Sequence, residues 1–320
     1  MSIMRTALSF ICILFVTTSF EARNLEIRTP SEGLSQDHLP QEGIPKGEFL
    51  GPFEFHSKII EGTVRRYWLF VPAQYEASTP AGVLVFHDGQ RATHPEGVLR
   101  VPQVMENLIG KGEMPVTIGI FITPGNLSEH YPDDLGWGNP NHRAPEYDAM
   151  DDRYSRFLLD EMLPEVGKSY NLSEDPDLRC IGGTSSGAIC AFTVAWYRPD
   201  AFGKVLSFIG SYVSIGFRPN ENPPRLGGQD YPALIRREPI RPIRMFLQDG
   251  HQDLDNEWGN WFLANQQMLA ALDYANAKAD RRGIEGPRYE VEAVWTDGVH
   301  NDDHAGALLP EALRWIYSDL

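Results

Sequence analysis

The segment Ile181-Gly182-Gly183-Thr184-Ser185-Ser186-Gly187-Ala188 decides the fold of this 320-residue chain. A short strand-like run precedes its central turn, and a helix-like segment, residues 188–197, follows it. The pattern Gly-x-Ser-x-Gly between a strand and a helix is typical of a nucleophile elbow, in which a sharp turn lifts the serine hydroxyl above the sheet. Glycines flank the serine because a Cβ there would collide with the neighbouring strand or helix. Ser185 is therefore predicted to be a nucleophile.

Strand-like and helix-like segments alternate from residue 53 onward, which predicts an α/β fold with a mostly parallel sheet. Several predicted strands are nearly continuous apolar runs, as expected when helices cover both faces of the sheet. The first two strands are separated by a short polar turn and are expected to pair antiparallel at one edge. The predicted strands are 53–60, 67–71, 83–87, 116–122, 178–181, 204–210, 243–248 and 289–295. The predicted helices are 103–111, 153–166, 186–197, 260–278 and 308–318.

The N-terminal 22 residues have the pattern of a secretory signal peptide, with Arg5 before a short apolar run. We therefore expect the protein to be secreted or periplasmic. Residues 23–50 are polar and proline-containing and are expected to form a flexible lead-in. Residues 51–320 are expected to form one domain.

Two long irregular stretches, residues 123–152 and 211–241, are predicted to form the walls of a substrate pocket. Both should rise at the edge of the sheet that carries Ser185.

The formal charge of −16 disfavours nucleic acid and anionic membrane surfaces as partners, because like charges repel. Beyond the signal, no stretch is long and apolar enough to predict stable membrane insertion. Cys180 and Cys190 flank the elbow, and either a disulfide or two buried thiols fits the sequence.

An activated serine needs a histidine base and an acid that orients it, and with this elbow they follow in the order Ser, Asp, His. Three aspartates, Asp249, Asp253 and Asp255, follow the predicted strand 243–248. We favour Asp253, because the loop can turn at the intervening glycine before it points back, and keep the other two as alternatives.

His300 follows the last predicted strand and a turn-forming glycine, and is the favoured base over His304. The spacing of these two histidines would also suit two ligands of a metal ion, but a single short cluster is weak evidence for a metal site. We expect neither a metal ion nor a cofactor.

Two backbone N–H groups are needed to stabilise an oxyanion, one from the residue after the nucleophile and one from a loop after an early strand. Ser186 meets the first requirement, and Gly89 or Gln90 the second, unless that loop is a plain Asp-Gly turn. Among possible substrate-binding residues, Arg143 could hold an anionic group, but a structural ion pair is the favoured interpretation. Trp137 and Trp258 could bind an aromatic or sugar ring; for Trp258, packing of the following helix against the sheet is favoured.

The assembled pattern resembles the enterochelin-esterase-like branch of the α/β-hydrolase superfamily from about residue 53 to the C-terminus. Feruloyl and acetylxylan esterases and S-formylglutathione hydrolase are more distantly similar. The resemblance is carried by Gly62-Thr63-Val64-Arg65 with Tyr67-Trp68, Val85-Phe86-His87-Asp88-Gly89, Arg153-Tyr154 with Phe157-Leu158 and Leu163-Pro164-Glu165, the elbow, Asp249-Gly250 with Asp253-Leu254-Asp255-Asn256, Gly259-Asn260-Trp261 with Ala264-Asn265, and Gly298-Val299-His300-Asn301. A second glycine is frequent in the family where this chain has Val299.

The resemblance implies an α/β-hydrolase fold without a large separate cap domain and cofactor-free ester hydrolysis through an acyl-enzyme. The expected substrate is a small-molecule or polysaccharide-linked ester, first a siderophore ester of the enterochelin type. A feruloyl or acetylxylan ester is the alternative. Acyl transfer at the same site and a non-catalytic binding protein are further alternatives.

Overall fold

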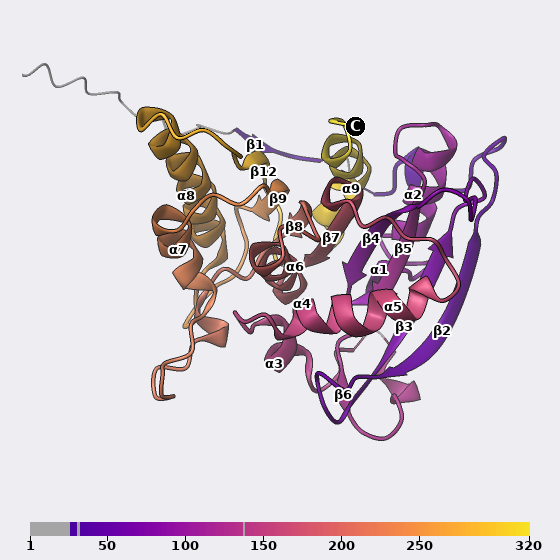
Figure 1. Ribbon diagram of the computed structural model, residues 1–320, viewed down its shortest axis with the longest axis horizontal. Helices are drawn as coiled ribbons and strands as arrows, with labels where there is room; N and C mark the ends of the chain where they lie inside the picture. Colours follow the sequence, from indigo (N-terminus) through magenta and orange to yellow (C-terminus); the bar gives the residue numbers. More distant parts are fainter. Residues whose placement is uncertain (1–25, 31–32, 137) are drawn as a thin grey trace, which may run out of the picture.

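The computed structural model describes residues 26–30, 33–136 and 138–320. The expected signal, residues 1–22, and Trp137 lie outside the described residues. Strands and helices alternate along most of the chain, as the apolar pattern predicts (Figure 1). None of the helices in the described ranges is long and apolar enough to span a membrane.

The strands are β1 (Ile27–Arg28), β2 (Glu48–His56), β3 (Thr63–Val71), β4 (Gly82–His87), β5 (Thr117–Ile122), β6 (Asn126–Leu127), β7 (Arg179–Thr184), β8 (Lys204–Phe208), β9 (Arg244–Gly250), β10 (Asp255–Asn256), β11 (Gly259–Asn260) and β12 (Glu290–Thr296). The α-helices are α1 (Gly89–Ala92), α2 (Val101–Gly110), α3 (Arg143–Tyr147), α4 (Arg153–Phe157), α5 (Leu163–Gly167), α6 (Ser186–Tyr197), α7 (Tyr231–Arg237), α8 (Trp261–Arg281) and α9 (Asp303–Ile316). A π-helical turn, Leu158–Met162, divides the helix expected at 153–166 into α4 and α5.

The main sheet has the strand order β1-β12-β9-β8-β7-β4-β5-β3-β2, with β6 paired to β3. Strands β4, β5, β7, β8, β9 and β12 pair in parallel, and β1 adds to β12 in parallel. The first two predicted strands form the antiparallel pair β2 and β3 at the opposite edge, which confirms that expectation. Because the central strands are parallel, their carboxyl ends meet at one edge, where the loops after β4, β7, β8, β9 and β12 converge.

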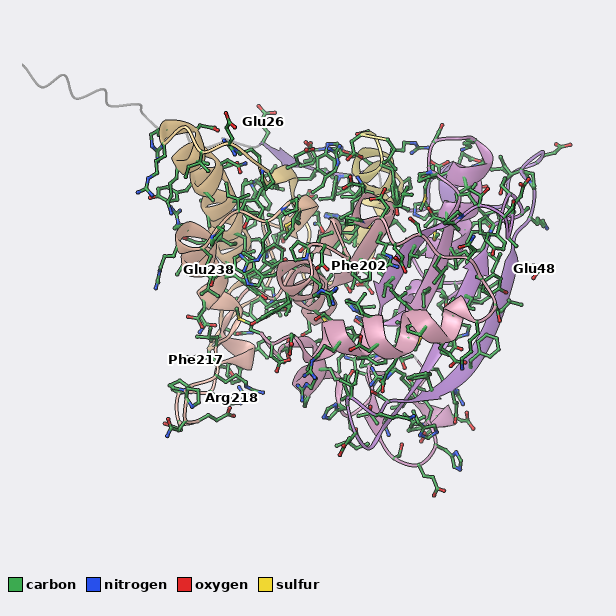
Figure 2. All side chains as sticks on the ribbon, viewed as in Figure 1. Glu26, Glu48, Phe202, Phe217, Arg218 and Glu238 are labelled. Carbon is green, nitrogen blue, oxygen red and sulfur yellow. The ribbon has the colours of Figure 1, made fainter. Side chains whose placement is uncertain are left out.

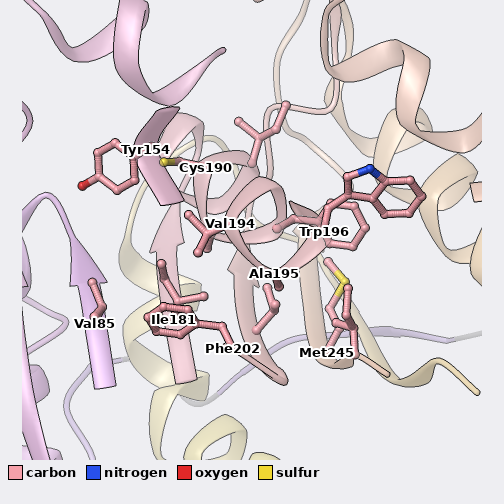
Figure 3. Packing of buried hydrophobic residues seen from close by; sticks show 14 of the residues in the cluster. Val85, Tyr154, Ile181, Cys190, Val194, Ala195, Trp196, Phe202 and Met245 are labelled. Atoms are coloured by element: carbon pink, nitrogen blue, oxygen red, sulfur yellow. The ribbon is translucent and has the colours of Figure 1, made fainter. Parts of the chain in front are cut away.

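Both faces of the sheet are covered by helices, and successive strand residues pack into different cores. Val83 and Val85 face the larger core, which also contains buried residues of α4, α6 and α8. Figure 3 shows Val85 in this core with Tyr154 of α4 and Val194 of α6. Leu84 and Phe86 face the smaller core beneath α2 and α9. Apolar side chains on both sides of β4 explain why its sequence is a continuous apolar run rather than an alternating one.

The part of the expected lead-in 23–50 that the structure describes contacts the domain at several points. Strand β1 extends the sheet beside β12, and the side chain of Thr29 donates to Asp297 Oδ2 at 2.7 Å. Asp37 accepts hydrogen bonds from Lys111 and Arg314, so this segment is tied to both α2 and α9. Sequence periodicity gave no sign of these contacts because each joins positions far apart in the chain.

The stretches 123–152 and 211–241 are not wholly irregular, since they contain α3 and α7. Between β8 and α7 a loop carrying Phe217 and Arg218 extends away from the body of the molecule (Figure 2). The Arg218 guanidinium donates to the carbonyl oxygens of Ile215 and Phe217 in the same loop.

Candidate active site

Ser185 lies at the turn between β7 and α6, with φ 57° and ψ −122°. A non-glycine residue with positive φ is strained, and such strain persists only where the surrounding structure enforces it. A Cβ on Gly183 would lie 2.8 Å from the carbonyl carbon of Gly187, so strand and helix approach each other too closely for any side chain there. The elbow predicted from the sequence therefore has the expected backbone.

His300, in the loop after β12, brings its Nε2 to 2.8 Å from Ser185 Oγ. On the other side of the ring, Nδ1 lies 2.6 Å from Asp253 Oδ1. The structure thus brings together the three side chains that the sequence singled out, from loops after three different strands. A neutral imidazole that donates from Nδ1 to Asp253 presents its Nε2 lone pair to the serine hydroxyl, which is the arrangement for general-base activation.

Asp253 has no exposed side-chain surface. Burial alone would raise the pKa of its carboxyl, but hydrogen bonds with His300 and Asp249 hold that pKa below its ordinary value. The carboxylate therefore stays ionised beside the imidazole. Of the two alternatives, Asp255 lies exposed in β10, whereas Asp249 is buried at the end of β9 and bonds Asn265. Neither Asp249 nor Asp255 is hydrogen-bonded to the imidazole of His300.

His304 lies on α9, with its Nε2 3.9 Å from an Asp297 carboxylate oxygen. Within the described ranges, no group of three or more His, Cys, Asp and Glu side chains is arranged to hold a metal ion. Cys180 and Cys190 are free and buried, the second in the larger core (Figure 3).

Ser211, the first residue of the predicted pocket wall 211–241, and Trp261 make contacts with the predicted triad that the sequence did not predict. Ser211 Oγ lies 3.1 Å from Ser185 Oγ and accepts a hydrogen bond of 3.1 Å from the Trp261 indole N–H. The indole also packs edge to face on the His300 ring, with centroids 5.7 Å apart. Trp261 lies in a family motif, but Ser211 sits in an irregular loop where no sequence signal marks it.

The predicted oxyanion residues lie at two helix starts. Ser186 is the first residue of α6. Sequence reasoning missed Asp148, a buried aspartate whose carboxyl pKa is raised by burial. Gly89 and Gln90 open α1, directly after β4. A Cβ on Gly89 would lie 2.6 Å from the carbonyl carbon of Phe121, so only glycine allows this approach. The first N–H groups of a helix have no intrahelical partner and are free to bind an oxyanion.

Arg143 forms a bidentate ion pair with Asp88, at 2.9 and 2.8 Å. Arg91 adds a third bond of 2.9 Å to the same carboxylate. Burial raises the pKa of Asp88, but the two guanidinium groups more than offset it and lower that pKa to about 2. The structure therefore places Arg143 in a structural ion pair, the interpretation that the sequence favoured over substrate binding. Trp258 is 44% exposed beside the β10–β11 turn.

His87, at the end of β4, predicts how stability depends on pH. It is fully buried, and its Nδ1 lies 2.8 Å from the carbonyl oxygen of Gly187, so the neutral ring donates there. Burial lowers the pKa of His87 from 6.5 to about 4. The folded state therefore resists protonation, and stability that is complete above pH 6.5 is lost as the pH falls toward 4.

We expect the free energy of unfolding to fall by about 3 kcal/mol over this interval from His87 alone. Urea denaturation at pH 7, 5.5 and 4 measures it. The amide of the variant His87→Gln can still donate to Gly187 but does not titrate. Its free energy of unfolding should therefore decrease by about 3 kcal/mol less than that of the parent between pH 7 and 4. Asp88 does not obscure the result, because its lowered pKa matters only below about pH 4. An equal fall in both proteins would contradict the assignment.

The family model described as "Putative esterase" matches residues 60–313. The iron(III) enterobactin esterase of Dickeya dadantii is 22% identical over 282 residues, which are 80% of this chain and 58% of that protein. The uncharacterized protein YbbA of Bacillus subtilis is 23% identical over 151 residues, 46% of this chain and 57% of that protein. The chain thus spans less than three fifths of the curated relatives that it matches.

Two kinds of solved structure share the fold. The enterobactin esterase from Shigella flexneri superposes with a TM-score of 0.59 at 19% identity, covering 90% of this chain and 61% of that one. The ferulic acid esterase AmCE1/Fae1A from Anaeromyces mucronatus gives a TM-score of 0.60 at 16% identity, covering 92% and 100%. These similarities confirm the predicted α/β-hydrolase fold. With the family model matching most of its length, the chain belongs to the esterase family.

Proposed function

We propose that this protein is a serine esterase in which Ser185 is the nucleophile, His300 the base and Asp253 the acid that orients the base. The observation that carries the proposal is the continuous pair of hydrogen bonds through the imidazole, 2.8 Å to the serine and 2.6 Å to the aspartate. Membership of the esterase family supports carboxylic esters as the substrates.

In the first half of the reaction, Ser185 Oγ bonds to the ester carbonyl carbon while its proton passes to His300 Nε2. The N–H groups of Ser186 and of Gly89 or Gln90 stabilise the negative carbonyl oxygen. His300 then gives the proton to the leaving alkoxide as the ester C–O bond breaks, which leaves an acyl-serine. In the second half, water repeats these steps, releases the acid and restores the serine.

The substrate that fits best is an ester without net negative charge whose acyl group is apolar or aromatic. Leu254 and Val299, next in sequence to Asp253 and His300, are exposed large apolar side chains, as is Trp258. The nearby Arg91 and Arg143 are held by Asp88. These exposed apolar side chains suit an aromatic acyl group, and the two arginines are already paired with Asp88 rather than free to bind an anion. Both observations favour a feruloyl-type ester. The likeness to enterobactin esterases supports a siderophore ester as the second candidate.

We also propose that the protein is exported, because residues 1–22 have the charge and apolar pattern of a signal peptide.

A fluorophosphonate probe and a panel of esters test this function. We expect the probe to label the protein at Ser185, and we expect methyl ferulate to be hydrolysed with higher kcat/KM than enterobactin or acetylated xylan. Faster cleavage of enterobactin would favour the siderophore candidate. Acylated alcohol formed on adding an alcohol would show acyl transfer, and failure of labelling would favour a binding protein.

A further inference from the structure

A second carboxyl group lies behind the proposed triad. Asp249, at the carboxyl end of β9, is completely buried. One of its oxygens accepts the N–H of Gly250 at 2.7 Å, and the other accepts the Asn265 amide at 2.7 Å. Its side chain is also within hydrogen-bonding reach of the Asp253 carboxyl. Two carboxyl groups can bond to each other only if one of them carries a proton.

The position of that proton follows from the partners of Asp253. Asp253 Oδ1 accepts hydrogen bonds from His300 and from the N–H of Leu254. Asp253 Oδ2 is buried, and no N–H group or hydroxyl in the described part of the chain donates to it. A buried carboxylate oxygen without a donor is costly, and a protonated Asp249 supplies the missing donor.

We propose that Asp249 is a positioning residue for the triad: a neutral carboxylic acid that donates to Asp253 Oδ2 and holds the carboxylate against His300. The inference rests on the proposed function. Asp249 does not touch substrate, and its proton stays in place during turnover. Fixing both oxygens of Asp253 prevents the carboxylate from rotating away when the imidazole becomes charged.

The groups around Asp249 agree with the neutral form. Across the loop it faces the carboxylate of Asp253, and beyond that His300. The loop after β8 contributes the phenol of Tyr212, α8 the neutral amide of Asn265, and β12 the hydroxyl of Thr296, which donates to the Asp249 carbonyl. Burial and the neighbouring carboxylate both raise the pKa of Asp249 well above its ordinary value. The proton therefore remains on Asp249 rather than on Asp253.

The first test is the pH dependence of thermal stability. Because the folded-state pKa of Asp249 is raised, the stability that its protonation contributes is complete below about pH 4 and is lost as the pH rises toward that pKa. The variant Asp249→Asn keeps an N–H donor for Asp253 and has no proton to lose. The Tm of the variant minus the Tm of the parent should therefore increase by about 2 to 3 °C for each pH unit above 4, up to the pKa of Asp249 in the folded protein.

Asp160→Asn, which removes an exposed carboxyl in the π-helical turn, is the matched control and should show no such trend. A difference in Tm between Asp249→Asn and parent that stays constant with pH would overturn the proposal, because an ionised Asp249 that only accepts hydrogen bonds predicts that result.

The second test is kinetic. Asp249→Ala should lower kcat about tenfold or more with KM within about twofold, because a misplaced base slows the chemical step. Asp249→Asn should restore kcat to within about threefold of the parent. Equal kcat losses in the two variants, or a change in KM alone, would overturn a positioning role. If the parent hydrolysed no ester, the proposed function would fail, while the Tm comparison would still decide the protonation of Asp249.

Discussion

Replacing Ser185 with alanine is expected to lower kcat for p-nitrophenyl acetate by about 10⁴-fold or more while the protein stays folded. The serine oxygen forms the bond to the acyl group, so no other group can replace it in the same reaction. Removing the nucleophile of a triad costs about as much as removing all its members, because they act as one unit. The residual rate should come from the oxyanion donors and substrate binding.

Initial-rate kinetics with Tm measured in parallel separates chemistry from folding. The Tm of Ser185→Ala should stay within a few degrees of the parent, since the hydroxyl is partly exposed and the elbow backbone is kept. Ser169→Ala, the same change at an exposed serine between α5 and the N-terminal end of β7, should leave kcat unchanged. Parental turnover by Ser185→Ala would show that hydrolysis takes place elsewhere.

Replacing Arg65 with methionine is expected to cause the largest loss of stability, about 3 to 5 kcal/mol. The side chains of Arg65 and Glu146 are both completely buried and paired at 2.9 and 3.1 Å. The guanidinium also lies 4.1 Å from the centre of the Phe157 ring. Without Arg65, the buried Glu146 carboxylate would lose its arginine counterion and keep His142 and the N–H of Gly125 as its partners. Urea denaturation at pH 7 measures the loss.

The loss should depend on pH in a defined direction. Burial would raise the pKa of Glu146, but Arg65 is the main reason that it is lowered instead. In Arg65→Met that pKa should rise, so the variant should lose more stability at pH 8 than at pH 5. The double variant Arg65→Met/Glu146→Gln removes the buried carboxylate charge and should recover about half of the loss. A single variant within about 1 kcal/mol of the parent would contradict this account.

The sequence predicts the site well where chemistry depends on the ends of successive parallel strands. Ser185, Asp253 and His300 each follow such a strand, and parallel pairing brings those ends to one edge whatever the details of packing. The elbow is equally local, since its glycines and serine are neighbours in the chain.

The rest of the site depends on contacts that no local pattern encodes. Ser211 meets Ser185 only because the loop after β8 folds back, and nothing in the sequence around Asp249 predicts its hydrogen bond with the buried Asn265. Sequence also could not tell which acid would pair with which arginine: Arg143 binds Asp88, whereas Glu146 binds Arg65. Such choices are made by tertiary packing.

The pairing of β1 with β12 joins residues 27–28 to residues 295–296, directly beside the loop that carries His300. The N–H of Asp297, three residues before His300, donates to the carbonyl oxygen of Arg28. During synthesis residues 27–28 are made long before residues 290–300, so this corner of the sheet can close only after both segments have been made. Under the proposed mechanism, a growing chain that had not yet reached His300 would therefore carry Ser185 without its base.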